Sequence, residues 1–138
     1  MKKLLILFAL IGFLLPTPTQ SVQAQDRCKL AEAALILTGY TPRTDHDHRQ
    51  ISYKSHSTLQ KTFIAGKTYA ILVTPSNSAN LDIYLYDDLG NLITYDNTYD
   101  STGIIEFTVY RTTTFKVLIE NRSGYATNAS IVYGYSPS

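Results

Sequence analysis

Between residues 59 and 138, hydrophobic side chains recur at every second position, which is the spacing of a strand with one buried face. The clearest case is residues 81–86, where three aliphatic residues alternate with an aspartate and two tyrosines. A turn sequence follows, in which Gly90 can adopt a positive φ, and a new apolar run begins at Leu92. The pattern therefore predicts a β-hairpin at this position.

Similar segments on both sides of this hairpin bring the number of predicted strands to about seven. Turn-forming residues separate them at the spacing of 8–12 residues that is typical of a sandwich. Residues 95–103 are rich in turn formers and predict a polar loop. The sequence therefore predicts an all-β fold, a sandwich of two antiparallel sheets. The predicted strands centre on 59–64, 69–73, 81–86, 92–93, 105–110, 115–120 and 129–135.

The first 24 residues are typical of a secretory signal peptide. They combine Lys2 and Lys3 with an apolar run at 4–15 and with small residues before Gln25. We expect cleavage after Ala24 and a secreted or periplasmic mature protein. A retained membrane anchor is the weaker alternative, because the apolar run is shorter than the roughly 20 residues that cross a bilayer.

Residues 25–58 predict one short helix followed by a polar segment. Strong helix formers fill 30–37, and Gly39 stands where the helix would end. Such a short helix needs an apolar partner, and we expect it to lie on an end or an outer face of the β domain. The alternatives are a frayed tail and an intermolecular contact. Residues 41–57 are too polar for a core and predict a linker or an edge segment, so the sandwich domain is expected at 59–138.

Charge and cysteine content exclude some functions. The chain has 12 basic and 11 acidic residues, so it lacks the basic excess that marks nucleic-acid or anionic-membrane binding. Cys28 is the only cysteine, which excludes an intrachain disulfide. It is either a small buried residue at the start of the helix, or it forms a disulfide bond with a second chain in a dimer.

Five short motifs follow one another along the chain: Phe63-Ile64-Ala65-Gly66-Lys67, Leu81 to Asp87, Gly90-Asn91, Phe115-Lys116-Val117 and Gly124-Tyr125 through Val132. Their order resembles that of the bacterial pre-peptidase C-terminal (PPC) domain family. Two departures are the threonines at 112–114, where the family usually has a glycine, and the N-terminal helix, which is outside the family core. The resemblance implies a jelly-roll-like β-sandwich with a non-catalytic accessory role.

Oxygen-bearing side chains near the hairpin make calcium the first candidate ligand. Calcium prefers several carboxylate and carbonyl oxygens, but no Asp-x-Asp-x-Asp-Gly loop is present. The alternative is that these residues simply form turns. The candidate ligands are Asp82, Asp87, Asp88 and Asn91, with Asp96, Asn97 and Asp100 nearby.

A second candidate site is a transition-metal site at His46 and His48. An extended backbone points both imidazoles to the same side, and His56 is a candidate third ligand. Asp45 and Asp47 flank them and offer further oxygens. The alternative is a solvated polar linker.

The tyrosines are the third candidate feature, since the chain has 11 of them and no tryptophan. Tyr84, Tyr86 and Tyr110 fall on the polar side of their predicted strands. Exposed rings on a sheet can stack on sugars or anchor a protein partner. The alternatives are that tyrosine is a favoured strand residue, or that the helix covers these rings.

No motif for nucleophilic catalysis or phosphate binding is present. The sequence therefore predicts a non-catalytic, secreted or periplasmic module that recognises a protein or polysaccharide surface. The alternatives are a small metal-binding protein that uses the His-x-His segment, and a structural subunit of a secreted assembly.

Overall fold

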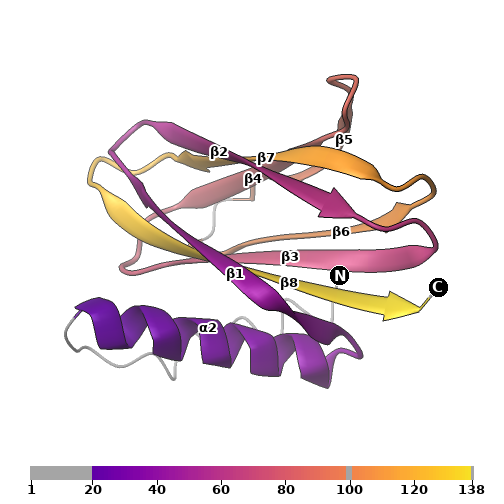
Figure 1. Cartoon of the computed structure of the whole chain (residues 1–138). Coiled ribbons are helices and arrows are strands. Elements are labelled where there is room, and N and C mark those ends of the chain that lie inside the picture. The colour runs from indigo at the N-terminus through magenta and orange to yellow at the C-terminus, as the bar shows by residue number, and fades with distance from the viewer. Residues whose placement is uncertain (1–19, 99–100, 138) are drawn as a thin grey trace.

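A computed structural model of the chain describes residues 20–98 and 101–137, with side chains for 26–98 and 101–136. The described residues form one helix and eight strands (Figure 1). The helix is α2 (Gln20–Leu37). The strands are β1 (Thr41–Ile51), β2 (His56–Phe63), β3 (Lys67–Pro75), β4 (Leu81–Tyr86), β5 (Leu92–Asp96), β6 (Gly103–Val109), β7 (Thr113–Asn121) and β8 (Thr127–Pro137).

The strands form two four-stranded antiparallel sheets that face each other, which confirms the predicted all-β sandwich. The first sheet has the order β1-β8-β3-β6, and the second has the order β2-β7-β4-β5. Ile83, Phe107 and Val117 point into the core between them, as their alternation predicts. The ring of Phe63 packs against those of Phe107 and Phe115 within this core.

The polar segment after the helix is an edge strand rather than a linker. β1 pairs along its length with β8, with one irregularity between Pro42 and His46. An edge strand bonds to one neighbour only and leaves much of its surface in water, so a mostly polar sequence can still form it. The sandwich therefore starts at Thr41, before the boundary at residue 59 that the hydrophobic pattern predicts.

The end of β5 also differs from the sequence pattern. Tyr95 and Asp96 belong to this strand, whereas the pattern predicts that a loop begins at Tyr95. Tyr95 pairs directly with Tyr84 of β4, and Asp96 pairs with Ile83. Turn-forming residues are abundant after Tyr95, so the local sequence pattern does not predict these last two strand positions.

Helix α2 is longer than the predicted segment 30–37 and lies along the outer face of the first sheet (Figure 1). Cys28, Ala31 and Leu35 follow helical spacing and pack with side chains such as Leu72 and Val132 of that sheet. The helix ends at Leu37, and Gly39, two residues later, has a φ of 93°. The expected position on an outer face of the β domain is confirmed.

The predicted signal peptide lies mainly outside the described residues, because these begin at Gln20 in α2. Cleavage after Ala24 would leave a helix that starts at Gln25. Within the described part of the chain, α2 is not long and apolar enough to cross a membrane.

Candidate functional site

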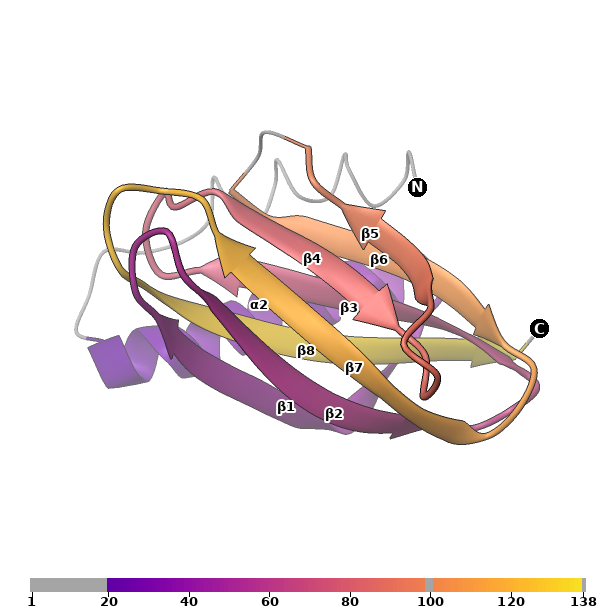
Figure 2. The same ribbon diagram turned by 90° about the horizontal axis from the view of Figure 1, so that it is seen from above.

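The outer face of the second sheet carries a group of side chains that we call the tyrosine face: Tyr84, Tyr86, Tyr95, Leu92, Lys116 and Leu118. Because side chains alternate along a strand, these residues point away from the core that their neighbours fill. The helix packs on β1, β3 and β8 of the opposite sheet, so among the described residues no helix covers this face (Figures 1 and 2).

Strand register places the side chains of the tyrosine face in two rows. One row joins Leu118, Tyr84 and Tyr95, and the other joins Lys116, Tyr86 and Leu92. The rings of Tyr84 and Tyr95 stack with their centroids 6.0 Å apart and an angle of 19° between their planes. Tyr95 remains 52% exposed. The stacked pair therefore offers a rigid apolar surface to water.

A cation completes the second row. The Lys116 ammonium lies 4.8 Å from the centre of the Tyr86 ring, which is a cation–π distance. This contact covers part of the Tyr86 ring and fixes a positive charge beside the stacked pair. The face thus combines aromatic area with a held charge.

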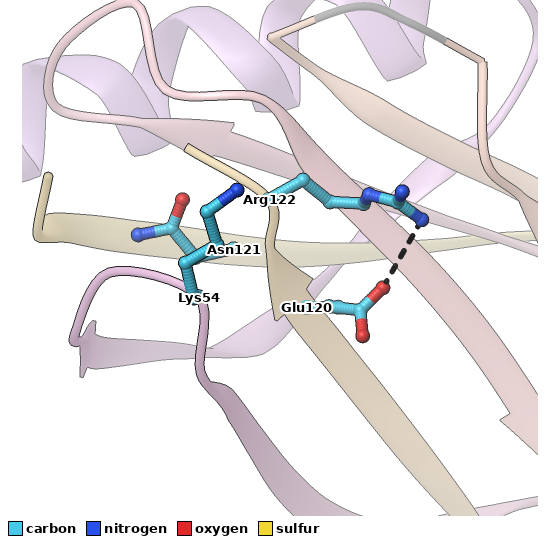
Figure 3. A pocket seen from close by; sticks show the side chains of 4 residues that line it. All are labelled: Lys54, Glu120, Asn121 and Arg122. Atoms are coloured by element: carbon cyan, nitrogen blue, oxygen red, sulfur yellow. Dashed lines mark ion pairs between the residues drawn. The ribbon is translucent and has the colours of Figure 1, made fainter. Parts of the chain in front are cut away.

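Charged residues border the tyrosine face where β4 begins. A shallow pocket of about 430 Å³ is lined there by Lys54, Glu120, Asn121 and Arg122 (Figure 3). The Arg122 guanidinium lies 3.6 Å from a Glu120 carboxylate oxygen and 3.5 Å from one of Asp82. Both signs of charge are therefore present within one border of the face.

The predicted ligand-binding tyrosines are placed differently from one another. Tyr84 and Tyr86 both lie on the tyrosine face, whereas Tyr110 is in the turn between β6 and β7 and is 88% exposed. Tyr95, which the sequence pattern does not single out, takes part in the stacked pair instead. The alternative that the helix covers the rings of Tyr84 and Tyr86 is wrong, because α2 packs on the opposite sheet.

Among the described residues, the side chains proposed as calcium ligands lie in two places, and Asp100 is outside the described residues. Asp87 accepts hydrogen bonds from the amides of Leu89 and Asn91 within the β4–β5 turn, and these bonds lower its pKa. Asp88 pairs with Arg111. Asp82 lies instead on β4 and is buried beside Arg122, where burial raises its pKa.

Asp96 is engaged as well, because its carboxylate accepts bonds from Thr98 and from the Ile104 amide. The carboxylates of Asp87, Asp88 and Asp96 therefore already bind donor groups of the protein. Calcium binding stays a prediction.

The histidines do not form the predicted trio. His46 and His48 lie on the same side of β1 with their ring centroids 5.2 Å apart. His56 begins β2 in the second sheet, opposite Glu120. The third group close to both rings is Cys28 of α2, and the three ligand atoms lie within 4.8 Å of one another.

Two other expectations about this region are also not met. Asp45 and Asp47 point to the other side of β1, where both bind Lys61, so they do not join the histidines. The disulfide dimer is not supported either, because Cys28 is a free thiol that is only 2% exposed. Its expected role as a small buried residue is confirmed.

No protein-family model and no curated protein matches the chain. Several solved structures share its fold. The Yersinia pseudotuberculosis-derived mitogen is 20% identical with a TM-score of 0.53, over 67% of this chain and 86% of the mitogen. PliG of Aeromonas hydrophila, a periplasmic inhibitor of g-type lysozyme, is 10% identical with a TM-score of 0.52, over 72% and 90% of the two chains.

The pre-peptidase C-terminal domain of a Bacillus anthracis collagenase is also similar. It is 10% identical with a TM-score of 0.54, over 64% of this chain and 87% of that domain. At these identities the likeness concerns the fold alone, and it places a PPC domain among the related β-sandwiches.

Proposed function

We propose that the protein is a non-catalytic module that binds another protein through the tyrosine face. The observation that carries this proposal is the Tyr84–Tyr95 stack on a sheet face that α2 leaves uncovered. Tyrosine supplies a large contact area at little entropic cost, and aromatic residues are enriched at the centres of protein interfaces.

The surroundings of the stack favour a protein over a polysaccharide. Tyr84 and Tyr95 cover part of each other's faces, which reduces the ring area available for stacking on sugars. Lys116 and Arg122 add positive charges, and Glu120 adds a negative charge at the border. An aromatic centre with a mixed-charge rim is the usual anatomy of a protein interface.

We further infer that the protein acts outside the cytoplasm and is related to PPC domains. The basic and apolar segments of residues 1–24 support export. The motif order and the shared fold with the collagenase domain support the relationship. The periplasmic PliG shows that a sandwich of this fold can inhibit a lysozyme, so g-type lysozyme is a reasonable first protein to test as a partner.

A Cys–His contact does not favour catalysis. The Cys28 sulfur lies 3.9 Å from His48 Nε2, as in a nucleophile and base pair. However, Cys28 is 2% exposed, and burial raises the pKa of its thiol, so the thiolate nucleophile is both scarce and inaccessible to a large substrate.

Site-specific crosslinking tests the proposed interface. Tyr95 is replaced by the photoreactive amino acid p-benzoylphenylalanine, and the variant is irradiated in the cells that produce the protein. Tyr53, which is also exposed but lies between β1 and β2, is the matched control position. We expect a discrete protein adduct from position 95 and none from position 53.

The identified partner is then measured against the double variant Tyr84→Ala, Tyr95→Ala. We expect at least a 30-fold loss of affinity, corresponding to about 2 kcal/mol for a hot spot, with the Tyr53→Ala protein unchanged. Equal affinities of the double variant and the wild type would disprove the interface. If position 95 gives no adduct and the protein binds a polysaccharide in a tyrosine-dependent way, the partner is a carbohydrate and not a protein.

A further inference from the structure

Strand alternation places the side chains of the segment Asp45-His46-Asp47-His48 on two opposite sides of β1, the aspartates on one and the histidines on the other. Asp45 and Asp47 both bind the Lys61 ammonium, at 3.0 and 2.8 Å. His46 and His48 point to the opposite side, toward α2, where Cys28 lies. This segment therefore supplies two carboxylates that pair with Lys61 on one side of β1 and two imidazoles on the other side.

We propose that Cys28, His46 and His48 form a site for a thiophilic d10 cation, either Zn²⁺ or Cu⁺. One thiolate and two imidazoles are ligands that both ions accept. The three ligand atoms lie within 4.8 Å of one another, and the Cys28 sulfur is 3.9 Å from His48 Nε2. Ligand atoms bound to one such ion are about 3.5 Å apart, given bond lengths of about 2.0–2.3 Å. The ligand atoms must therefore approach one another by at most about 1.3 Å.

The orientation of His48 suits a metal ligand. Its Nδ1 lies 3.3 Å from the Ser130 hydroxyl, while Nε2 faces the sulfur. Histidines that bind metals commonly use one nitrogen for the ion and the other for a supporting hydrogen bond.

The thiol must release its proton to the solvent when the ion binds. Protons compete with the cation for the thiolate and the imidazoles, so binding weakens as the pH falls. His46 and His48 are exposed, so an ion can reach the buried sulfur from the imidazole side.

Binding at this place would join α2 to the edge strand β1. Cys28 is the only ligand from the helix, and both histidines come from the strand. An ion that binds the folded state but not the unfolded one also stabilises the fold. Metal binding should therefore raise the melting temperature of the protein.

Cobalt titration of the full chain tests the site directly. Co²⁺ reports thiolate coordination through a sulfur-to-cobalt charge-transfer band in the near ultraviolet, and displacement by Zn²⁺ or Cu⁺ removes the band. We expect one equivalent of Co²⁺ to produce the band, with loss of the band in Cys28→Ser and in the double variant His46→Ala, His48→Ala. His56→Ala is the matched control and should behave like the wild type.

The outcomes distinguish the two ions and the absence of a site. Removing a ligand should weaken binding at least about 100-fold, because removing a mere supporting hydrogen bond already costs 10- to 100-fold. Competition against chelators for Zn²⁺ and for Cu⁺ identifies the preferred ion. No charge-transfer band, or the same band in Cys28→Ser, would overturn the proposal. The Tyr84→Ala, Tyr95→Ala variant should bind metal normally, since the tyrosine face is on the other sheet.

Discussion

The buried Tyr133 hydroxyl donates a hydrogen bond of 2.7 Å to the Asp47 carboxylate. The bond joins the centre of the first sheet to its edge strand, because Tyr133 lies on β8 and Asp47 on β1. Lys61 of the second sheet binds the same carboxylate oxygen at 2.8 Å and lies 5.0 Å from the Tyr133 ring centre. One carboxylate therefore links both sheets at this edge of the sandwich.

The Tyr133→Phe substitution should lower the free energy of unfolding by about 2 kcal/mol. It removes a hydrogen bond to a charged acceptor but keeps the ring in the core. Urea denaturation measures the change. Tyr125→Phe is the control, because Tyr125 is exposed and its hydroxyl contacts only Ser78 among the described residues. A loss below about 0.5 kcal/mol in Tyr133→Phe would show that Lys61 alone satisfies the carboxylate.

The ion pairs of Lys61 should make stability depend on pH at both extremes. Burial alone would raise the pKa values of Asp45 and Asp47, but their hydrogen bonds and charged partners outweigh it and lower both. Burial would likewise lower the pKa of Lys61, but the two carboxylates raise it. Lowered acid pKa values give stability that is lost below about pH 4, and a raised lysine pKa gives stability that is lost above about pH 10.4.

Urea midpoints between pH 2 and pH 11 test this dependence. Lys61→Met should reduce the loss of stability at both low and high pH. Lys54→Met, at an exposed position, should leave both losses unchanged. Identical pH profiles for Lys61→Met and the wild type would contradict the assignment.

The contribution of Asp82 to stability should depend on pH in the opposite direction from those of Asp45 and Asp47. Its side chain is 1% exposed, and the nearest cation is Arg122 at 3.5 Å, too far for a strong hydrogen bond. Burial is the main cause of its raised pKa, with Glu120 and Asp96 adding to it and Arg122 opposing it. A raised acid pKa means that folding favours the protonated form, so the ionised form costs stability at pH 7.

The Asp82→Asn variant should therefore have a higher urea midpoint than the wild type at pH 7, and the difference should shrink as the pH falls and disappear below about pH 4. Asp88→Asn, which removes a surface ion pair with Arg111, should change stability by less than about 1 kcal/mol. A lower midpoint for Asp82→Asn at pH 7 would mean that the contact with Arg122 outweighs the cost of burial.

The sequence predicts the fold wherever one face of a strand is aliphatic. β4 begins and ends at the predicted residues, and Gly90 in the following turn has a φ of 87°. β1 lacks this signal because its two faces carry aspartates and histidines, neither of which marks a core. Its strand conformation depends on pairing with β8, which is far away in the sequence.

The candidate sites were predictable only in part, for the same reason. The outward direction of Tyr84 follows from local alternation, but its stacking partner Tyr95 required the end of β5 to be known. The spacing of His46 and His48 predicts that they point the same way. That Cys28 joins them depends on how α2 packs on the first sheet, which no local pattern encodes.

The close contact of α2 with the first sheet predicts a specific effect of substituting Gly134. A Cβ atom at this position of β8 would lie 3.1 Å from Leu35 Cδ1 and 3.1 Å from Tyr40 Cβ. The Leu35 methyl group can move, but Tyr40 Cβ is next to the backbone and cannot. Gly134→Ala should therefore push the helix outward and lower the free energy of unfolding by about 1–3 kcal/mol.

Hydrogen exchange separates a local effect on the helix from a general loss of stability. In Gly134→Ala, amides of α2 should exchange faster, while those of β4 in the opposite sheet should change only as much as global stability does. Gly124→Ala is the matched control, because a Cβ atom there meets nothing within 4 Å. Unchanged exchange in α2 of Gly134→Ala would show that the helix accommodates the methyl group, and that its packing against β8 is looser than the contacts of Leu35 and Tyr40 indicate.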